Sequence, residues 1–226
     1  MVVKGEINMN ILSIKNLTYN SQNTQILKGI SFDVKKGDCI SIVGQSGSGK
    51  STLLKLCADL IPMTSGDIYF YEKSYKNYNP VELRKKISYC VQIPHLFGKT
   101  VYDNLEFPFK IRNEKVDKNR LEMLLNKFNL NLSYLDKNID SLSGGEKQRI
   151  SIIRNLIYIP EILLLDEATA SLDKENASLV EKYIKELNDN GVTVLWITHS
   201  KEQSESIFNK RIEIYEGTVS KVEDLI

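Results

Sequence analysis

The stretch DCISIVGQSGSGKSTLLKLC, residues 38–57, contains three local patterns in succession. It begins with a short, mostly apolar run that is typical of a buried strand. Glycines follow at Gly44, Gly47 and Gly49. From residue 51 the apolar side chains recur at helical spacing, at Leu53, Leu54, Leu56, Cys57, Leu60 and Ile61. The stretch therefore predicts a strand, a glycine-rich loop and a helix.

The loop of this stretch satisfies the P-loop pattern, in which two glycines precede a lysine and a hydroxyl residue. Glycines let backbone N–H groups close around a phosphate, and the helix N-terminus adds positive potential. Lys50 can reach the terminal phosphates of a nucleotide, and Ser51 can ligate Mg²⁺. A plain glycine turn into a helix is the alternative, but the flanking strand and helix favour phosphate binding. The predicted nucleotide-binding residues here are Gly44, Gln45, Ser46, Gly47, Ser48, Gly49, Lys50, Ser51 and Thr52.

Composition argues against several classes of protein. The 226 residues include 30 basic and 29 acidic side chains, so no overall field favours nucleic acid as a direct partner. The longest apolar runs, at residues 162–165 and 194–197, are much shorter than the roughly 20 residues that span a bilayer. The N-terminus lacks the pattern of a secretory signal. Three widely spaced cysteines, Cys39, Cys57 and Cys90, indicate buried free thiols in a reducing cytoplasm.

Two regions, one in the first third of the chain and one near residue 216, have the patterns of antiparallel strands. Residues 11–19, 26–34 and 67–71 carry alternating or short apolar runs separated by turn residues, which indicates an antiparallel sheet. Residues 211–222, with Glu216 and Gly217 at the centre, are typical of a hairpin. We therefore expect antiparallel pairing near both ends of the chain.

Four short apolar runs end in polar residues, at Gly44, Gln92, the pair Asp166 and Glu167, and His199. Continuous apolar strands separated by helices predict a parallel sheet that is covered on both faces. Ligands gather at the carboxyl ends of such strands. We therefore expect the four polar ends to lie together.

The middle of the chain, residues 100–158, has helical patterning. One apolar stripe consists of Leu121, Leu124, Leu125 and Phe128, and another of Ile150, Ile153, Leu156 and Ile157. We interpret this region as a helical subdomain inserted between two strands of the sheet. The fold class is therefore α/β, and residues 1–226 form a single domain.

Asp166 and Glu167 are the candidate catalytic carboxylates. One carboxylate can hold Mg²⁺, and its neighbour can orient the attacking water or accept its proton, so we assign Asp166 to the metal and Glu167 to the water. A pair of residues that caps the next helix is the alternative. The P-loop favours the chemical interpretation.

The chain has two histidines. His199 follows a predicted strand parallel to those that end near Gln92 and Glu167, so it can hydrogen-bond the γ-phosphate and hold Glu167. Without that position, a structural role would be the default. His95 follows a proline in a loop and is interpreted as structural.

The stretch LSGGEKQRI, residues 142–150, places two glycines at the start of a predicted helix. Ser143 and Glu146 have the spacing of a capping box, which accounts for the helix start but not for the glycines. Each glycine costs roughly 1 kcal/mol relative to alanine inside a helix. Ser143 Oγ with the N–H groups of Gly144 and Gly145 would form a second anion site. A two-fold dimer would let this site cover the nucleotide on the P-loop of the other copy.

These motifs, in this order and over nearly the whole chain, resemble the ATP-binding cassette (ABC) ATPases. The resemblance implies a P-loop NTPase fold in which residues 1–99 and 159–226 form a RecA-like core with an antiparallel subdomain, and residues 100–158 form the helical subdomain. It also implies a head-to-tail dimer in the ATP-bound state. Gln92 matches the glutamine that senses Mg²⁺ and the γ-phosphate, and residues 171–173 match the D-loop. Tyr19 matches the aromatic residue that stacks on adenine, although it could equally pack into the sheet.

The segments at residues 87–113 and 142–156 resemble the FetA (YbbL) group of iron-export ATP-binding subunits. That resemblance implies an ATPase at the inner face of the cell membrane that drives a separate transmembrane permease and exports iron or another metal. A cassette that regulates a membrane complex without moving cargo is the alternative. DNA-repair and ribosomal cassettes fit less well, because the chain has one cassette and about ninety residues between its P-loop and LSGGE motifs.

Overall fold

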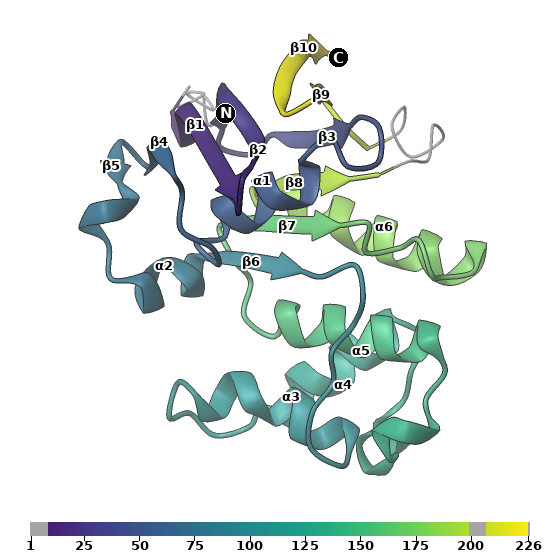
Figure 1. The fold of residues 1–226 in the computed structure, drawn as a ribbon. Helices are drawn as coiled ribbons and strands as arrows, with labels where there is room; N and C mark the ends of the chain where they lie inside the picture. Colours follow the sequence, from purple (N-terminus) through teal and green to yellow (C-terminus); the bar gives the residue numbers. More distant parts are fainter. Residues whose placement is uncertain (1–8, 199–206, 226) are drawn as a thin grey trace, which may run out of the picture.

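The computed structural model describes residues 9–198 and 207–225 (Figure 1). A four-stranded antiparallel sheet has the order β2-β1-β4-β5. Its strands are β1 (Asn10–Ser21), β2 (Thr24–Lys35), β4 (Ser65–Phe70) and β5 (Lys73–Ser74). The three segments predicted to pair here lie in β1, β2 and β4, and alternate residues of β2 are buried from Ile30 to Val34. The antiparallel prediction is therefore confirmed.

A second sheet has six strands in the order β10-β9-β3-β8-β7-β6. Its strands are β3 (Cys39–Val43), β6 (Ile87–Cys90), β7 (Ile162–Asp166), β8 (Thr193–Ile197), β9 (Lys210–Tyr215) and β10 (Thr218–Asp224). Strands β9, β3, β8, β7 and β6 are parallel, and only β10 pairs antiparallel, as the predicted hairpin with β9. The mainly parallel core is therefore confirmed, and the ends of β3, β6, β7 and β8 lie at the same edge.

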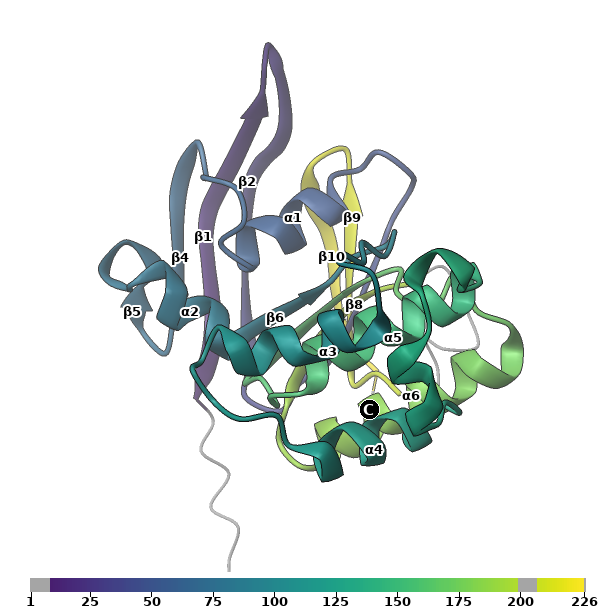
Figure 2. The ribbon, with the colours of Figure 1, turned by 90° about the horizontal axis from the view of Figure 1, so that it is seen from below.

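Helices cover both faces of this sheet. They are α1 (Lys50–Cys57), α2 (Pro80–Lys86), α3 (Val101–Lys110), α4 (Lys118–Lys127), α5 (Gly144–Leu156) and α6 (Lys174–Asp189), with short 3₁₀ turns at η1 (Tyr75–Asn77), η2 (Leu132–Asp136) and η3 (Ile139–Ser141). Figure 2, seen from below, shows α3, α4 and α5 in front of the six-stranded sheet, with the antiparallel sheet extending away to one side. The segment predicted to be helical thus lies on one face.

The helix predicted to follow the glycine loop is shorter than its apolar pattern. It ends at Cys57, and Leu60, predicted to continue it, is 50% exposed. Asp59 has a positive φ of 54°, and the N–H of Leu60 donates to the carbonyl of Lys55 at 2.9 Å. This is a Schellman termination, which usually has glycine at the left-handed position, so an aspartate there does not signal the end of a helix.

Two hydrophobic clusters lie on opposite faces of the six-stranded sheet. In β7, Leu163 and Leu165 belong to one cluster, while Ile162 and Leu164 belong to the other. Successive side chains of a strand point to opposite faces, so a strand buried on both faces is continuously apolar. The three cysteines are free and buried, and burial raises the pKa of each thiol to about 12.

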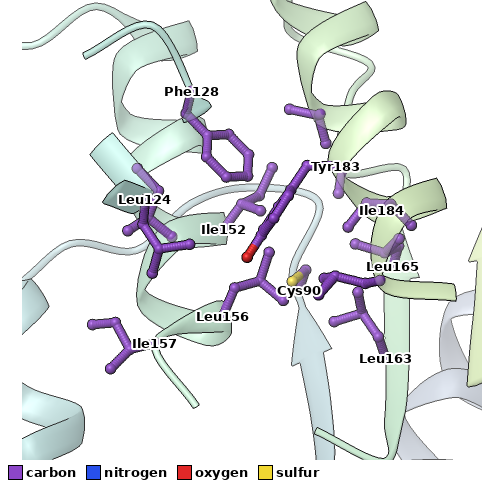
Figure 3. Close-up of a cluster of buried hydrophobic side chains, with 14 of the residues drawn as sticks. Cys90, Leu124, Phe128, Ile152, Leu156, Ile157, Leu163, Leu165, Tyr183 and Ile184 are labelled. Atoms are coloured by element: carbon purple, nitrogen blue, oxygen red, sulfur yellow. The ribbon is translucent and has the colours of Figure 1, made fainter. Parts of the chain in front are cut away.

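The helical segment shares one of these clusters with the sheet (Figure 3). Leu124 and Phe128 approach Ile152 of α5 and Tyr183 of α6, and the rings of Phe128 and Tyr183 meet edge to face with centroids 5.6 Å apart. Both predicted apolar stripes of this segment are buried. The segment is therefore anchored through a continuous core.

Replacing Phe128 by alanine should lower the free energy of unfolding by about 3–5 kcal/mol, because Phe128 is fully buried and a cavity would remain. Urea denaturation measures the change. The matched control is Leu132→Ala in the same segment, where the side chain is 40% exposed and a change within about 0.5 kcal/mol is expected. Equal effects from the two variants would contradict the shared core.

Candidate active site

The loop between β3 and α1 requires glycine at two positions. Gly44 has a φ of +146°, and a Cβ there would lie 2.1 Å from the carbonyl oxygen of Ile214. Gly49 has a φ of +102°, and a Cβ there would lie 2.6 Å from Cδ2 of Leu27. Because an L side chain would be both strained and obstructed at these positions, the two glycines fix the loop that joins the strand to the helix.

Lys50 is only 5% exposed and places its charge within the loop. Its Nζ donates to the carbonyls of Gly44, at 2.9 Å, and Gln45, at 2.8 Å. Burial lowers the pKa of Lys50, while the nearby charges of Glu167 and Asp166 raise it. The loop therefore holds a cation next to the start of a helix.

The loop also fits a phosphate. Ser48 Oγ is buried and has no hydrogen-bond partner, and α1 begins without a side-chain cap. Buried polar groups normally have partners, and free N–H groups at a helix N-terminus favour anions. The orphaned hydroxyl, the uncapped helix and Lys50 together make the donor set that a nucleotide's phosphates need.

Asp166, the last residue of β7, is 3% exposed and accepts two hydrogen bonds. Ser51 Oγ donates to its Oδ1 at 2.9 Å, and the hydroxyl of Tyr89 donates to its Oδ2 at 2.7 Å. Burial, together with the hydrogen bond to Asp166, raises the pKa of Tyr89, so its hydroxyl remains a donor at neutral pH. Ser51 and Asp166 provide the hard oxygen ligands that suit Mg²⁺.

Glu167 follows directly and meets the predicted glutamine. Gln92 Nε2 donates to Glu167 Oε2 at 2.7 Å. Glu167 has a positive φ of 48°, which is rare for a residue other than glycine, and its N–H donates to the carbonyl of Ile197 at 3.1 Å. Such backbone strain clusters at functional sites.

The alternative interpretation of this acidic pair, as caps of the next helix, is not supported. Helix α6 begins at Lys174, and its N-cap is Asp173, whose side chain accepts from the N–H of Asn176 at 2.9 Å. Asp166 and Glu167 lie several residues earlier, at the strand end. Their carboxylates therefore do not cap α6.

Of the other residues considered in the sequence, the structure describes His95 and Tyr19 but not His199. His199 lies outside the described residues, and β8 ends at Ile197, opposite Asp166 in the parallel register. His95 lies exposed in a loop, where its carbonyl accepts from Arg154. Tyr19 lies in β1, partly buried against the core, so packing and base stacking both remain open for it.

The LSGGE loop caps α5 as its spacing predicts. Ser143 is the N-cap, and it forms a reciprocal capping box with Glu146. The hydroxyl of Tyr134 donates to Glu146 Oε1 at 2.8 Å, and Lys137 Nζ lies 3.5 Å from the same oxygen. The hydrogen bond from the N–H of Ser143, with those neighbours, lowers the pKa of Glu146 to about 2.

The two glycines of this loop are not explained by the fold of the chain. Neither has a positive φ. A Cβ on Gly144 would meet nothing within 4 Å, and on Gly145 the nearest atom, Cδ2 of Leu172, is at an ordinary 3.5 Å. Helix α5 belongs to one hydrophobic cluster and α1 to the other, so the helices that carry the two loops pack on opposite faces of the sheet (Figure 1).

Comparison with known proteins identifies this arrangement. A family model described as "ABC transporter" matches residues 27–170. The chain belongs to the ABC transporter family. ABC cassettes are ATPases, and so is this chain.

Curated relatives share most of the cassette. "Probable iron export ATP-binding protein FetA" of Escherichia coli K12 is 45% identical over 200 residues, which is 87% of this chain and 88% of that protein. "Ergothioneine transport ATP-binding protein EgtV" of Helicobacter pylori G27 is 34% identical over 90% of this chain and 97% of its own. "Spermidine/putrescine import ATP-binding protein PotA" of Mycoplasma mycoides is 36% identical, and this ABC chain spans 61% of its length.

Solved structures share the fold of the ABC cassette. The dimeric post-hydrolysis state of the cassette MJ0796 bound to ADP and Pi has a TM-score of 0.86 and 29% identity, over 95% of this chain and 99% of that one. A bacterial Atm1-family ABC exporter with ATP bound has a TM-score of 0.86 at 24% identity, over 96% of this chain and 39% of that chain, which shows the shared fold alone.

Sequence reasoning missed two polar contacts of the site. Tyr89 was not a candidate, because a tyrosine in a strand is ordinary and gives no sign of a carboxylate partner. Tyr134, which lies on a 3₁₀ turn, was also missed. Its distance of 12 residues from Glu146 matches no local motif.

The pKa of Glu146 yields a prediction for acid stability. Folding lowers this pKa from 4.5 to about 2, so the carboxylate stabilises the fold above pH 4.5 and loses that effect as the pH falls toward 2. The variant Glu146→Gln should be less stable than the native chain at pH 7, and the difference should narrow between pH 5 and pH 3.

Urea denaturation at several pH values tests this. The control Glu122→Gln, on the exposed side of α4, should leave the unfolding free energy at pH 7 within about 0.5 kcal/mol. A difference for Glu146→Gln that stays constant down to pH 3 would mean that the ionised carboxylate does not stabilise the loop.

Proposed function

We propose that the chain binds ATP with Mg²⁺ at the P-loop and hydrolyses it with the residues of the adjoining strand ends. The observation that carries this proposal is the pair of hydrogen bonds at the end of β7, from Ser51 to Asp166 at 2.9 Å and from Gln92 to Glu167 at 2.7 Å. Lys50 lies buried in the adjoining P-loop. When bound, Mg²⁺ neutralises charge on the phosphate oxygens. The chain's own residues supply the rest.

Each of these residues has a distinct role in the proposed reaction. Residues 44–52 cradle the phosphates with backbone N–H groups, and Lys50 stabilises charge on the terminal phosphates. Ser51 and Asp166 hold the metal. Glu167 orients the attacking water and accepts its proton, and the hydrogen bond from Gln92 fixes its carboxylate. We assign His199 to the γ-phosphate and Tyr19 to the adenine ring from their positions in the sequence.

We also propose that ATP is held between two copies of the chain. Gly144 and Gly145 are free of packing constraints within the chain, so their small size suits close approach by an outside group. Ser143 and the N-terminus of α5 would then contact the γ-phosphate on the partner's P-loop. The similar MJ0796 cassette is described as dimeric, which supports this arrangement.

The variant Glu167→Gln should bind ATP normally but hydrolyse it at least about a hundredfold more slowly, since the loss of a general base typically removes 10²–10⁴-fold in rate. It should therefore accumulate as a dimer under saturating Mg-ATP. Sedimentation velocity with and without nucleotide measures the oligomeric state.

A second substitution tests whether the LSGGE loop contacts the nucleotide of its own chain or that of the partner. Glu167→Gln combined with Ser143→Arg should still bind ATP but remain monomeric, because the arginine would fill the space that the partner's nucleotide needs. Loss of ATP binding in the double variant would instead place the LSGGE loop within the site of its own chain.

A permease is the proposed partner of this dimer. A groove is lined by Phe107 of α3, by Ile111, which directly follows α3, and by Arg84 and Arg112, and Ile111 is 57% exposed. An amphipathic helix with an acidic residue, from a cytoplasmic loop of the permease, suits a groove lined by both apolar and cationic side chains. None of the helices in the described part of the chain is long and apolar enough to cross a bilayer. We place the protein at the inner face of the cell membrane.

Iron, or another metal ion, is the proposed cargo, exported by the permease. The similarity to FetA supports this choice, while EgtV and PotA carry names of other cargoes at lower identity. No cluster of three or more potential metal-ligating side chains is present among the described residues, so cargo selection is assigned to the permease. A cassette that regulates a membrane complex without moving cargo is the alternative function.

Purification of the chain from its native membranes should recover one permease, and vesicles containing both should move Fe²⁺ only with Mg-ATP. Ile111→Asp should abolish the recovery, whereas the matched control Leu132→Asp, an exposed leucine outside the groove, should not. Recovery of a permease without ATP-dependent Fe²⁺ movement would reject iron as cargo. Unchanged recovery with Ile111→Asp would reject the groove as the docking site.

A further inference from the structure

Tyr89 donates a hydrogen bond to the carboxylate oxygen of Asp166 that Ser51 leaves free. The carboxylate of Asp166 has two oxygens, and each accepts one hydrogen bond, Oδ1 from Ser51 at 2.9 Å and Oδ2 from Tyr89 at 2.7 Å. The terminal torsion of an aspartate is broad, so a carboxylate bonded at one oxygen alone can still rotate. With both oxygens bonded, the plane of the Asp166 carboxylate is fixed.

Tyr89 reaches Asp166 across two neighbouring parallel strands. In the register of β6 with β7, Tyr89 lies beside Leu164, two residues before Asp166. Three residues after Tyr89, Gln92 donates to Glu167. One short segment of the chain therefore supplies a hydrogen bond to each of the two adjacent carboxylates at the end of β7.

We propose that Tyr89 is a positioning residue for the Mg²⁺ site. It sets the orientation of the Asp166 carboxylate and links that orientation to the position of β6. This inference rests on the proposed assignment of Mg²⁺ to Ser51 and Asp166. Tyr89 does not touch the metal or the nucleotide in this proposal. It acts only through Asp166.

A packing role is the competing explanation, because Tyr89 is partly buried against the core. Tyr89→Phe separates the two, since phenylalanine keeps the ring and removes only the hydroxyl. Tyr78→Phe is the matched control. Its hydroxyl is also lost, but that group donates to the carbonyl of Phe70 at 3.1 Å, away from the carboxylates.

The experiment measures metal and nucleotide binding separately on the full chain. Mn²⁺ serves as the probe for the Mg²⁺ site and is titrated, with electron paramagnetic resonance, into the complex with a non-hydrolysable ATP analogue. Binding of the same analogue is then measured in excess EDTA. Tyr89→Phe should weaken Mn²⁺ binding roughly tenfold, as expected for one hydrogen bond to a charged group, and leave binding in EDTA within about twofold. Tyr78→Phe should change neither.

Asp166→Asn tests whether Tyr89 acts through the carboxylate. It should weaken Mn²⁺ binding by itself, and adding Tyr89→Phe should produce no further loss, because the two changes act on one interaction. If Asp166→Asn weakens Mn²⁺ binding while Tyr89→Phe does not, the inference about Tyr89 fails and the metal assignment stands. If Asp166→Asn has no effect, both fail.

Two further results would overturn the inference. Parallel loss of analogue binding in EDTA would show that Tyr89 supports the whole loop rather than the metal site. A full additional loss in the double variant would show that Tyr89 acts by another route. Thermal melting verifies that each variant folds. If Tyr89→Phe does not fold, Tyr89→Met, which also lacks the hydroxyl, takes its place.

Discussion

The buried carboxylate of Asp166 is the constraint on which the site depends. At 3% exposure it loses almost all contact with water, so its charge requires partners inside the protein. Ser51 supplies one from the start of α1, and Tyr89 supplies another from β6. Helix α1 and strands β6 and β7 are thereby joined at one side chain. A displacement of any one of them would weaken a hydrogen bond to the buried charge of Asp166.

The arrangement of the site could be predicted from the sequence wherever it depends on local motifs and on the order of the parallel strands. Parallel strands bring their carboxyl ends to one edge, so the order of apolar runs was enough to bring Gln92 to Glu167 and Ser51 to Asp166. The fold could not be predicted where conformation departs from residue preference. Asp59 and Glu167 both have left-handed backbone, which sequence statistics assign to glycine. Tyr89 could not be predicted either, because its role depends on the register of β6 with β7.

The LSGGE loop is stable within the chain, yet its two glycines have no role in the packing of that chain. Its capping box and the contacts of Glu146 with Tyr134 and Lys137 hold the start of α5 without help. The glycines contribute nothing to that stability. Their cost to the helix is understood only when the loop faces a second copy of the ABC cassette, as we propose. Selection on the partner's site would therefore retain glycines that slightly destabilise the helix of their own chain.

The continuous core around Phe128 and Tyr183 couples the helical segment to α6. Separation of the helical segment from α6 would expose apolar rings to water, so the shared core favours movement of the two together. A displacement at the outer surface of α3 would then also move the start of α5 at Gly144, through the core that the two helices share. Ordinary apolar packing would thus be enough to couple a docked partner to the loops that begin these helices.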